Sequence, residues 1–186
     1  MRIILLFISL CISVNAFSAV IEGNPNGRVT MIEVFDYQCV YCHSAYPKIL
    51  KLMDKNPDLK VRLMPVAILN QLSLYEAAAA ITAANSPSKF QEFTNMAMIG
   101  NPLSENEITS DLNSLHLNSP DFKKQMHSKD VEDQLIQGLQ FLRLEKASTP
   151  LFIIYPSKNP KISAVLKGDQ KFSTLQKAIS EAGEGA

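Results

Sequence analysis

Two cysteines separated by two residues are the part of this sequence with the clearest chemistry. Cys39-Val40-Tyr41-Cys42 follows the apolar run VTMIEVF and opens a stretch in which apolar residues recur at helical spacing. The first turn of a helix has unpaired N–H groups and the positive end of the helix dipole, and both favour a thiolate. We therefore expect a lowered pKa and a nucleophilic role for Cys39, and a resolving role for Cys42 one turn deeper. The alternative is an inert structural disulfide, but a bridge that closes so short a loop adds little stability.

Glu33 is an acid within the apolar run, six residues before Cys39. If this side chain is buried, its pKa is raised and it can exchange a proton with Cys42. On an edge strand it would instead face outward. His43 follows the pair directly, either as a solvent-facing residue of the first helical turn or as a group that tunes Cys39 from one turn away.

Two prolines occupy positions that need a reason. Pro47 falls in the middle of the helix that the cysteine pair opens, where proline removes a hydrogen bond and favours a kink. Thr149-Pro150 opens a strand-like run far downstream. A proline there is either an ordinary first residue of a strand or part of a cis peptide bond.

Strand and helix patterns alternate along the chain in an order typical of an α/β fold. The first strand, helix and second strand suit a right-handed βαβ unit, and the last two strands suit an antiparallel hairpin. A four-stranded mixed sheet with a helical block in the middle is therefore predicted. The predicted strands are residues 29–35, 59–65, 151–155 and 162–166, and the predicted helices include 42–55, 72–84, 131–146 and 173–181. Helix starts are also predicted at Ser86-Pro87, at Ser104 with Glu107, and at Ser119-Pro120.

The segment VTMIEVFDYQCVYCHSAYPKIL, together with STPLFII downstream, resembles the thioredoxin-fold thiol:disulfide oxidoreductases of the DsbA-like kind. In that superfamily an acid lies where Glu33 lies, a helix-kinking proline where Pro47 lies, and a cis-proline loop where Thr149-Pro150 lies. The resemblance implies a helical insertion between the second and third core strands. It divides the chain into 17–65 with the cysteine pair, an insertion 66–146, and 147–186 with the cis-proline loop.

Some features depart from the DsbA pattern. Val40-Tyr41 stands where strongly oxidising members often have Pro-His, so we expect a less depressed pKa of Cys39 and a less oxidising disulfide. The CXYCH string and the threonine before the proline also resemble the isomerases DsbC and DsbG. Those carry an N-terminal dimerisation domain, for which this sequence has no room before its first strand. A monomer is therefore expected.

The N-terminus has the pattern of a secretory signal peptide at residues 1–16, with Arg2 before an apolar run and small residues before a cleavage site after Ala16. The alternative is an uncleaved membrane anchor. Cleavage would remove Cys11 and leave Cys39 and Cys42 as the two cysteines of an exported, periplasmic protein. The 18 basic and 18 acidic residues leave no net positive charge that would favour nucleic-acid binding. A polytopic membrane protein would need further long apolar runs, and the sequence has none after the N-terminal one.

The resemblance implies an enzyme that forms disulfides in exported proteins, or an isomerase or reductase of the same fold. Its partners would be reduced or unfolded exported proteins and a membrane redox partner of the DsbB or DsbD kind. No cofactor would be needed beyond the Cys39–Cys42 disulfide. Thr149 and Pro150 would bind substrate, while Val40, Tyr41 and His43 would tune the pair.

Three alternatives come from other classes. Cys39 to His43 is also a literal C-x-x-C-H, the attachment motif of c-type haem, with His43 as an axial ligand. A zinc site would use the same three side chains with a distant fourth ligand, for which His116 and His127 are the remaining histidines. A chaperone would bind unfolded chains without needing the cysteines.

Overall fold

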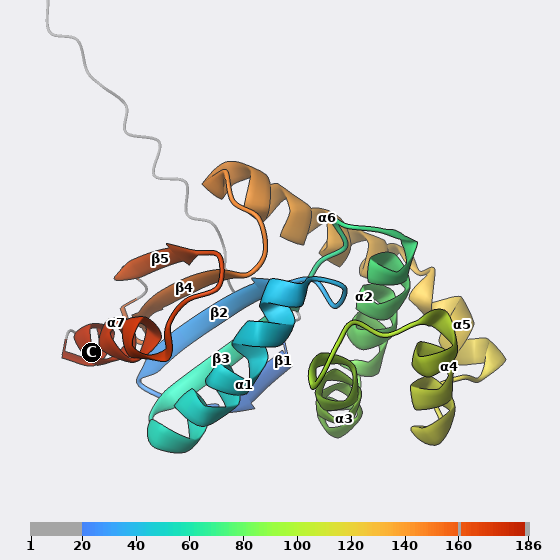
Figure 1. Ribbon diagram of the computed structural model, residues 1–186, viewed down its shortest axis with the longest axis horizontal. Helices are drawn as coiled ribbons and strands as arrows, with labels where there is room; N and C mark the ends of the chain where they lie inside the picture. The colour runs from blue at the N-terminus through green and yellow to red at the C-terminus, as the bar shows by residue number, and fades with distance from the viewer. Residues whose placement is uncertain (1–19, 160, 185–186) are drawn as a thin grey trace, which may run out of the picture.

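The computed structural model describes residues 20–159 and 161–184, which fold around one five-stranded sheet (Figure 1). The strand order is β1-β3-β2-β4-β5, so β2 is central, parallel to β3 and antiparallel to β4. The strands are β1 (Val20–Gly23), β2 (Val29–Phe35), β3 (Leu59–Pro65), β4 (Leu151–Pro156) and β5 (Ala164–Lys167).

The prediction of four strands was wrong by one. The short strand β1 pairs antiparallel with β3 at the sheet edge, and it was not expected. Strand β1 is stabilised by pairing with β3, which is distant in the sequence. Its four residues are too few to show the alternation of apolar and polar residues that would predict a strand. The other four strands are confirmed, although β5 begins at Ala164 and not at Ile162.

Two helices cover one face of the sheet. Helix α1 (Val40–Lys55) runs between the parallel strands β2 and β3, which confirms the predicted βαβ unit, and it contains Pro47. Helix α7 (Phe172–Glu184) lies beside α1 and packs on β4 and β2. The fold therefore brings the first turn of α1 to the carboxyl end of β2.

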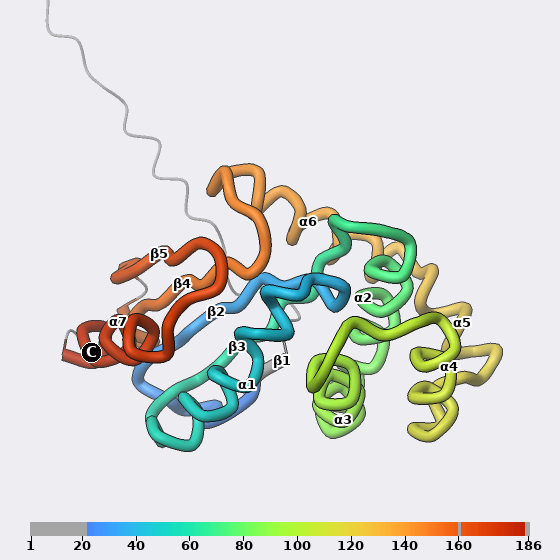
Figure 2. The backbone as a smooth tube through the Cα atoms, in the orientation of Figure 1, coloured from blue at the N-terminus to red at the C-terminus, as the bar shows by residue number. Residues whose placement is uncertain are grey.

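Five helices lie between β3 and β4, as the predicted insertion requires. The smooth trace shows them as a second lobe beside the sheet, from which α6 returns to β4 (Figure 2). The Ser104–Glu107 capping box and the Ser-Pro helix starts are present. The helices are α2 (Gln71–Ala83), α3 (Pro87–Met98), α4 (Glu105–Ser114), α5 (Pro120–Met126) and α6 (Lys129–Glu145).

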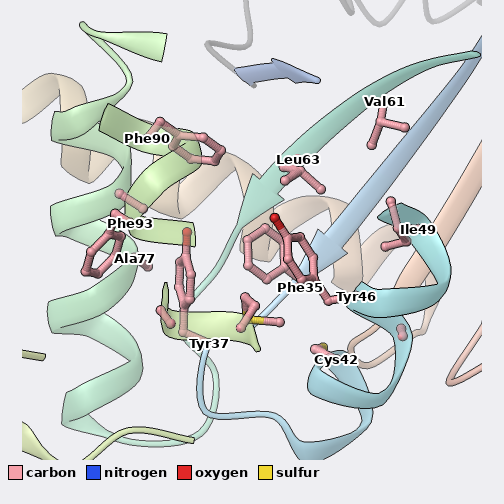
Figure 3. Close-up of a cluster of buried hydrophobic side chains, with 14 of the residues drawn as sticks. Phe35, Tyr37, Cys42, Tyr46, Ile49, Val61, Leu63, Ala77, Phe90 and Phe93 are labelled. Atoms are coloured by element: carbon pink, nitrogen blue, oxygen red, sulfur yellow. The ribbon is translucent and has the colours of Figure 1, made fainter. Parts of the chain in front are cut away.

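Apolar side chains fill both faces of the sheet. Alternate residues of β2 point to opposite sides, with Met31 and Phe35 towards α1 and Ile32 and Val34 towards Leu142 of α6. On the α1 face, the rings of Phe35, Tyr37 and Tyr46 gather near Cys42 (Figure 3). The cysteine pair thus lies above a closely packed core.

The predicted signal peptide 1–16, including Cys11, lies outside the described residues. Within the part of the chain that the structure describes, no helix has the length and apolar character needed to cross a bilayer.

Candidate active site

A short turn carries the chain from β2 to the cysteine pair. Asp36 holds it, because its backbone oxygen accepts from Cys39 N at 3.0 Å and its carboxylate accepts from Gln38 N at 2.8 Å. The second carboxylate oxygen accepts from Ile68 N, at 2.8 Å, in the loop after β3. Cys39 is the N-cap residue of α1, and both cysteines are free thiols.

The pKa of Cys39 is lowered to about 5, as its position at the helix start predicts. The hydrogen bond from the Cys42 thiol contributes most, and further lowering comes from Thr149 and from the backbone N–H groups of Cys42 and Tyr41, while burial opposes it. The contribution of Cys42 was not foreseen, because sequence reasoning considered only the helix terminus. At neutral pH Cys39 is therefore a thiolate.

Cys42 has the opposite character. The side chain is fully buried, and burial, the hydrogen bond to Cys39 and the nearby Glu33 all raise its pKa well above the ordinary range. The two sulfurs are thus a thiolate at the helix N-terminus and a more deeply buried, protonated thiol. This asymmetry fits Cys39 as the attacked sulfur and Cys42 as the one that gains and loses a proton.

Glu33 lies on the central strand, not on an edge, and is fully buried on the α1 face. Burial raises its pKa well above the usual range, with smaller contributions from Glu22, Cys39 and Asp169. Neither carboxyl oxygen has a hydrogen-bond partner among the described residues. A buried acid of this kind holds a proton at neutral pH and can transfer it to a nearby sulfur.

Sequence analysis missed Glu22, which is buried on β1 and 3% exposed. The sheet register places it opposite Val61, on the face that Glu33 also occupies, and burial raises its pKa to about 7. An acid in an otherwise apolar strand would have been the signal, but β1 itself was not predicted.

The predicted cis bond between Thr149 and Pro150 is present, directly before β4. Both residues are buried, and Cys39 Sγ lies 3.6 Å from the Thr149 carbonyl oxygen, to which the sulfur can donate when it is protonated. Pro150 in turn accepts from the backbone N–H of Gly168 at 2.8 Å. The loop therefore faces the reactive sulfur, while Val40 and Tyr41 beside that sulfur are exposed.

The expectation that His43 faces solvent was wrong. The ring is 6% exposed, and its Nε2 lies 2.6 Å from the carbonyl oxygen of Tyr37. A carbonyl only accepts, so Nε2 carries the proton and ties α1 to the turn before it. The atom that a c-type haem would need is engaged inside the protein, and no group of three or more His, Cys, Asp or Glu among the described residues is arranged to hold a metal ion.

A family model described as Thioredoxin matches residues 17–181. The chain belongs to the thioredoxin family. This membership confirms the resemblance, the fold class and dithiol/disulfide exchange as the enzyme's chemistry. No curated protein sequence matches the chain significantly.

Solved structures with the same fold are similar over nearly their whole length. A thioredoxin-like oxidoreductase from Silicibacter pomeroyi DSS-3 is 26% identical with a TM-score of 0.81, and the match covers 92% of this chain and 96% of that one. The thiol-disulfide exchange protein alpha-DsbA2 from Wolbachia pipientis is 21% identical, with a TM-score of 0.75 and coverage of 90% and 89%. A periplasmic thioredoxin-like protein from Salmonella enterica serovar Typhimurium is 19% identical, with a TM-score of 0.75 and coverage of 90% and 91%.

Proposed function

We propose that this thioredoxin-family protein is a DsbA-type oxidase, which donates the Cys39–Cys42 disulfide to exported proteins in the periplasm. The observation that carries the proposal is the asymmetry of the pair: Cys39 caps α1 beside the Thr149 carbonyl oxygen and has a lowered pKa, whereas Cys42 is fully buried. A lowered thiol pKa is typical of the Cys-X-X-Cys motifs of redox enzymes. A stabilised thiolate favours the reduced protein, and a favoured reduced form makes the disulfide a better oxidant.

The exchange would proceed in two steps at the two sulfurs. A client thiolate attacks Cys39 Sγ, the Cys39–Cys42 bond breaks, and its electron pair leaves on Cys42. Because the pKa of Cys42 is raised, this sulfur takes up a proton, for which Glu33 is the buried donor. A second client thiolate then attacks the client sulfur of the mixed disulfide and releases Cys39 as a thiolate. Two electrons have passed from client to enzyme.

Thr149 and Pro150 would present the client. Their loop lies against Cys39, and the exposed Val40 and Tyr41 flank the same sulfur. An extended client segment could pair with the backbone of such a loop. A membrane partner of the DsbB kind would then reoxidise the pair, or one of the DsbD kind would reduce it if the flow is reversed.

The periplasmic location rests on two observations. Residues 1–16 have the pattern of a secretory signal peptide. The Salmonella protein of the same fold is periplasmic. An oxidising compartment suits an enzyme that donates disulfides.

The reduction potential of the Cys39–Cys42 pair tests the oxidase assignment. The protein would be equilibrated in graded glutathione buffers, alkylated and weighed intact, since the chain has no Trp to report by fluorescence. We expect a potential between about −270 mV, the value of thioredoxin, and about −120 mV, the value of DsbA. A potential at or below thioredoxin's would contradict the oxidase role and indicate a reductase. Refolding of a scrambled client would separate oxidase from isomerase.

A further inference from the structure

The residue before the nucleophile is held by the helical insertion. The side-chain amide of Gln38 donates to Glu76 Oε2 in α2 at 2.8 Å and to the Leu103 carbonyl oxygen, in the loop before α4, at 3.0 Å. Its backbone N–H donates to Asp36. Gln38 is therefore fixed from both halves of the fold, one peptide bond away from Cys39.

Glu76 is a destabilising residue at this position. It is fully buried, and its second carboxyl oxygen has no hydrogen-bond partner among the described residues. The titratable groups that face it are Asp36 at the end of β2 and Asp111 on α4, which are also acidic. A buried carboxyl with one of its oxygens unpaired costs stability that an apolar side chain of similar size would not.

The insertion does not need Glu76 in order to dock. Tyr37 is hydrogen-bonded through its hydroxyl to Thr94 Oγ1 at 2.8 Å, and Tyr46 donates to Asn95 Oδ1 at 2.7 Å, so α3 is tied to both sides of the cysteine pair. Apolar packing across the same boundary includes Phe93 beside Tyr37. What Glu76 adds is the fixed direction of the Gln38 side chain.

We propose that Glu76 and Gln38 are positioning residues for Cys39, through which the insertion sets the turn that aims backbone N–H groups at the Cys39 sulfur. This rests on the proposed role of Cys39 as the reacting thiol. The N–H groups of Tyr41 and Cys42 belong to the first turn of α1, and their direction follows from the preceding turn 36–39. A displaced Gln38 would rotate that turn and weaken the stabilisation of the thiolate.

The test compares two substitutions at one site. Glu76→Gln keeps an oxygen that accepts from Gln38, whereas Glu76→Met fills the same space without an acceptor. The rate of Cys39 alkylation by iodoacetamide would be followed against pH on the reduced protein, by the mass of the singly alkylated species. For Glu76→Met we expect the midpoint to rise by about half a pH unit, the scale of one ordinary hydrogen bond. Glu76→Gln should keep the midpoint of the parent chain.

Controls separate positioning from charge and from folding. Asp111→Asn removes a negative charge beside Glu76 but leaves Gln38 untouched, so its midpoint should not move. Gln38→Ala should reproduce the shift of Glu76→Met, and it replaces a partly exposed side chain even if the buried variant does not fold. An unshifted midpoint in Gln38→Ala or in a folded Glu76→Met, or an equal shift in Asp111→Asn, overturns the proposal. The potential of the parent chain tests the oxidase role separately, so the two can fail independently.

Discussion

At the level of single residues, the chemistry depends on the different surroundings of the two sulfurs, which shift their pKa values in opposite directions. Cys39 is stabilised by the Cys42 thiol, by Thr149 and by two backbone N–H groups, and its pKa falls to about 5. Cys42 is buried in apolar surroundings near an acid, and its pKa rises. No basic side chain contributes to either shift, which agrees with the absence of a histidine between the cysteines.

Replacing Glu33 by Gln should slow the protonation of Cys42. Glutamine has a similar shape but cannot carry the proton, and general acid–base catalysis contributes roughly 100-fold or more. We expect disulfide reduction by a small thiol to be roughly 100-fold slower, or more, near neutral pH. Stopped-flow kinetics from pH 5 to 9 would measure the difference.

Glu92→Gln is the matched control for this prediction. The same chemical change is made on α3, where Glu92 is half exposed and pairs with Lys89. Its rate should equal that of the parent chain at every pH. Equal pH–rate profiles for Glu33→Gln and Glu92→Gln would show that Glu33 does not move the proton.

The residues that we propose to react could be singled out from the sequence because their spacing is local. Cys39, Cys42 and Glu33 lie within ten positions of one another, so a strand followed by a helix places them together. Gln38, Glu76 and Glu22 could not be predicted in this way. Gln38 and Glu76 are 38 residues apart, and Glu22 lies on the edge strand β1, which pairs with the distant strand β3, so only the folded chain places these side chains.

At the level of elements, one turn joins the active-site helix to the cis-proline loop. Asp169, between β5 and α7, accepts from Ser44 at 2.8 Å and from Lys48 at 2.5 Å, both on α1. The preceding Gly168 donates its N–H to the Pro150 carbonyl oxygen. This connection ties the helix that begins after Cys39 to the loop that contains Thr149, although the two lie far apart in the sequence.

Asp169→Ala should destabilise the protein measurably. The substitution removes two side-chain hydrogen bonds, one of them to a charged and three-quarters buried lysine. We expect a loss of about 1–3 kcal/mol in the free energy of unfolding. Urea denaturation followed by circular dichroism would measure it.

The comparison for Asp169 is another ion pair of this chain. Arg28 and Asp58 are more than half exposed, at 62% and 54% of their side-chain surface, and such pairs contribute little. Arg28→Ala should therefore change the free energy of unfolding by less than about 1 kcal/mol. Similar decreases in the free energy of unfolding of the two variants would mean that the contacts of Asp169 do not stabilise the fold more than an exposed ion pair does.

Most helices and strands were predictable because their signals are local. Ser104 with Glu107 and Ser119 before Pro120 mark helix starts through side-chain hydrogen bonds to the backbone within one turn, whereas the Ser86 side chain before Pro87 makes no such bond. The burial of His43 was not predictable, because helical position alone does not show that its ring turns towards the Tyr37 carbonyl oxygen.

At the level of the whole molecule, the fold tolerates several buried acids on the side of the active site. Glu22, Glu33 and Glu76 are each almost completely buried, and burial raises the pKa of all three. Paired carboxylates usually have lowered pKa values and stabilise a protein as pH rises. Here the direction is reversed, because the folded protein binds these protons more tightly than the unfolded chain does.

The stability of the oxidised protein should therefore fall as pH rises from about 4.5 to above 7. Below 4.5 the acids are protonated in both states, so their ionisation does not affect stability, whereas above 7 Glu22 and Glu76 are ionised inside the fold. A rise from 4.5 to about 7 corresponds to about 3 kcal/mol per group. The oxidised form is used because its cysteines do not titrate. Denaturation in urea at pH 5 and pH 8 would give the difference.

Glu22→Gln tests the origin of that pH dependence. Glutamine does not ionise, so the decrease in stability between pH 5 and pH 8 should shrink by about 2.5 kcal/mol relative to the parent chain. The absolute stability at pH 5 is not the criterion, because a buried amide also lacks partners at this site. An undiminished decrease in Glu22→Gln would mean that Glu22 ionises at its ordinary pKa and that β1 opens to water in solution.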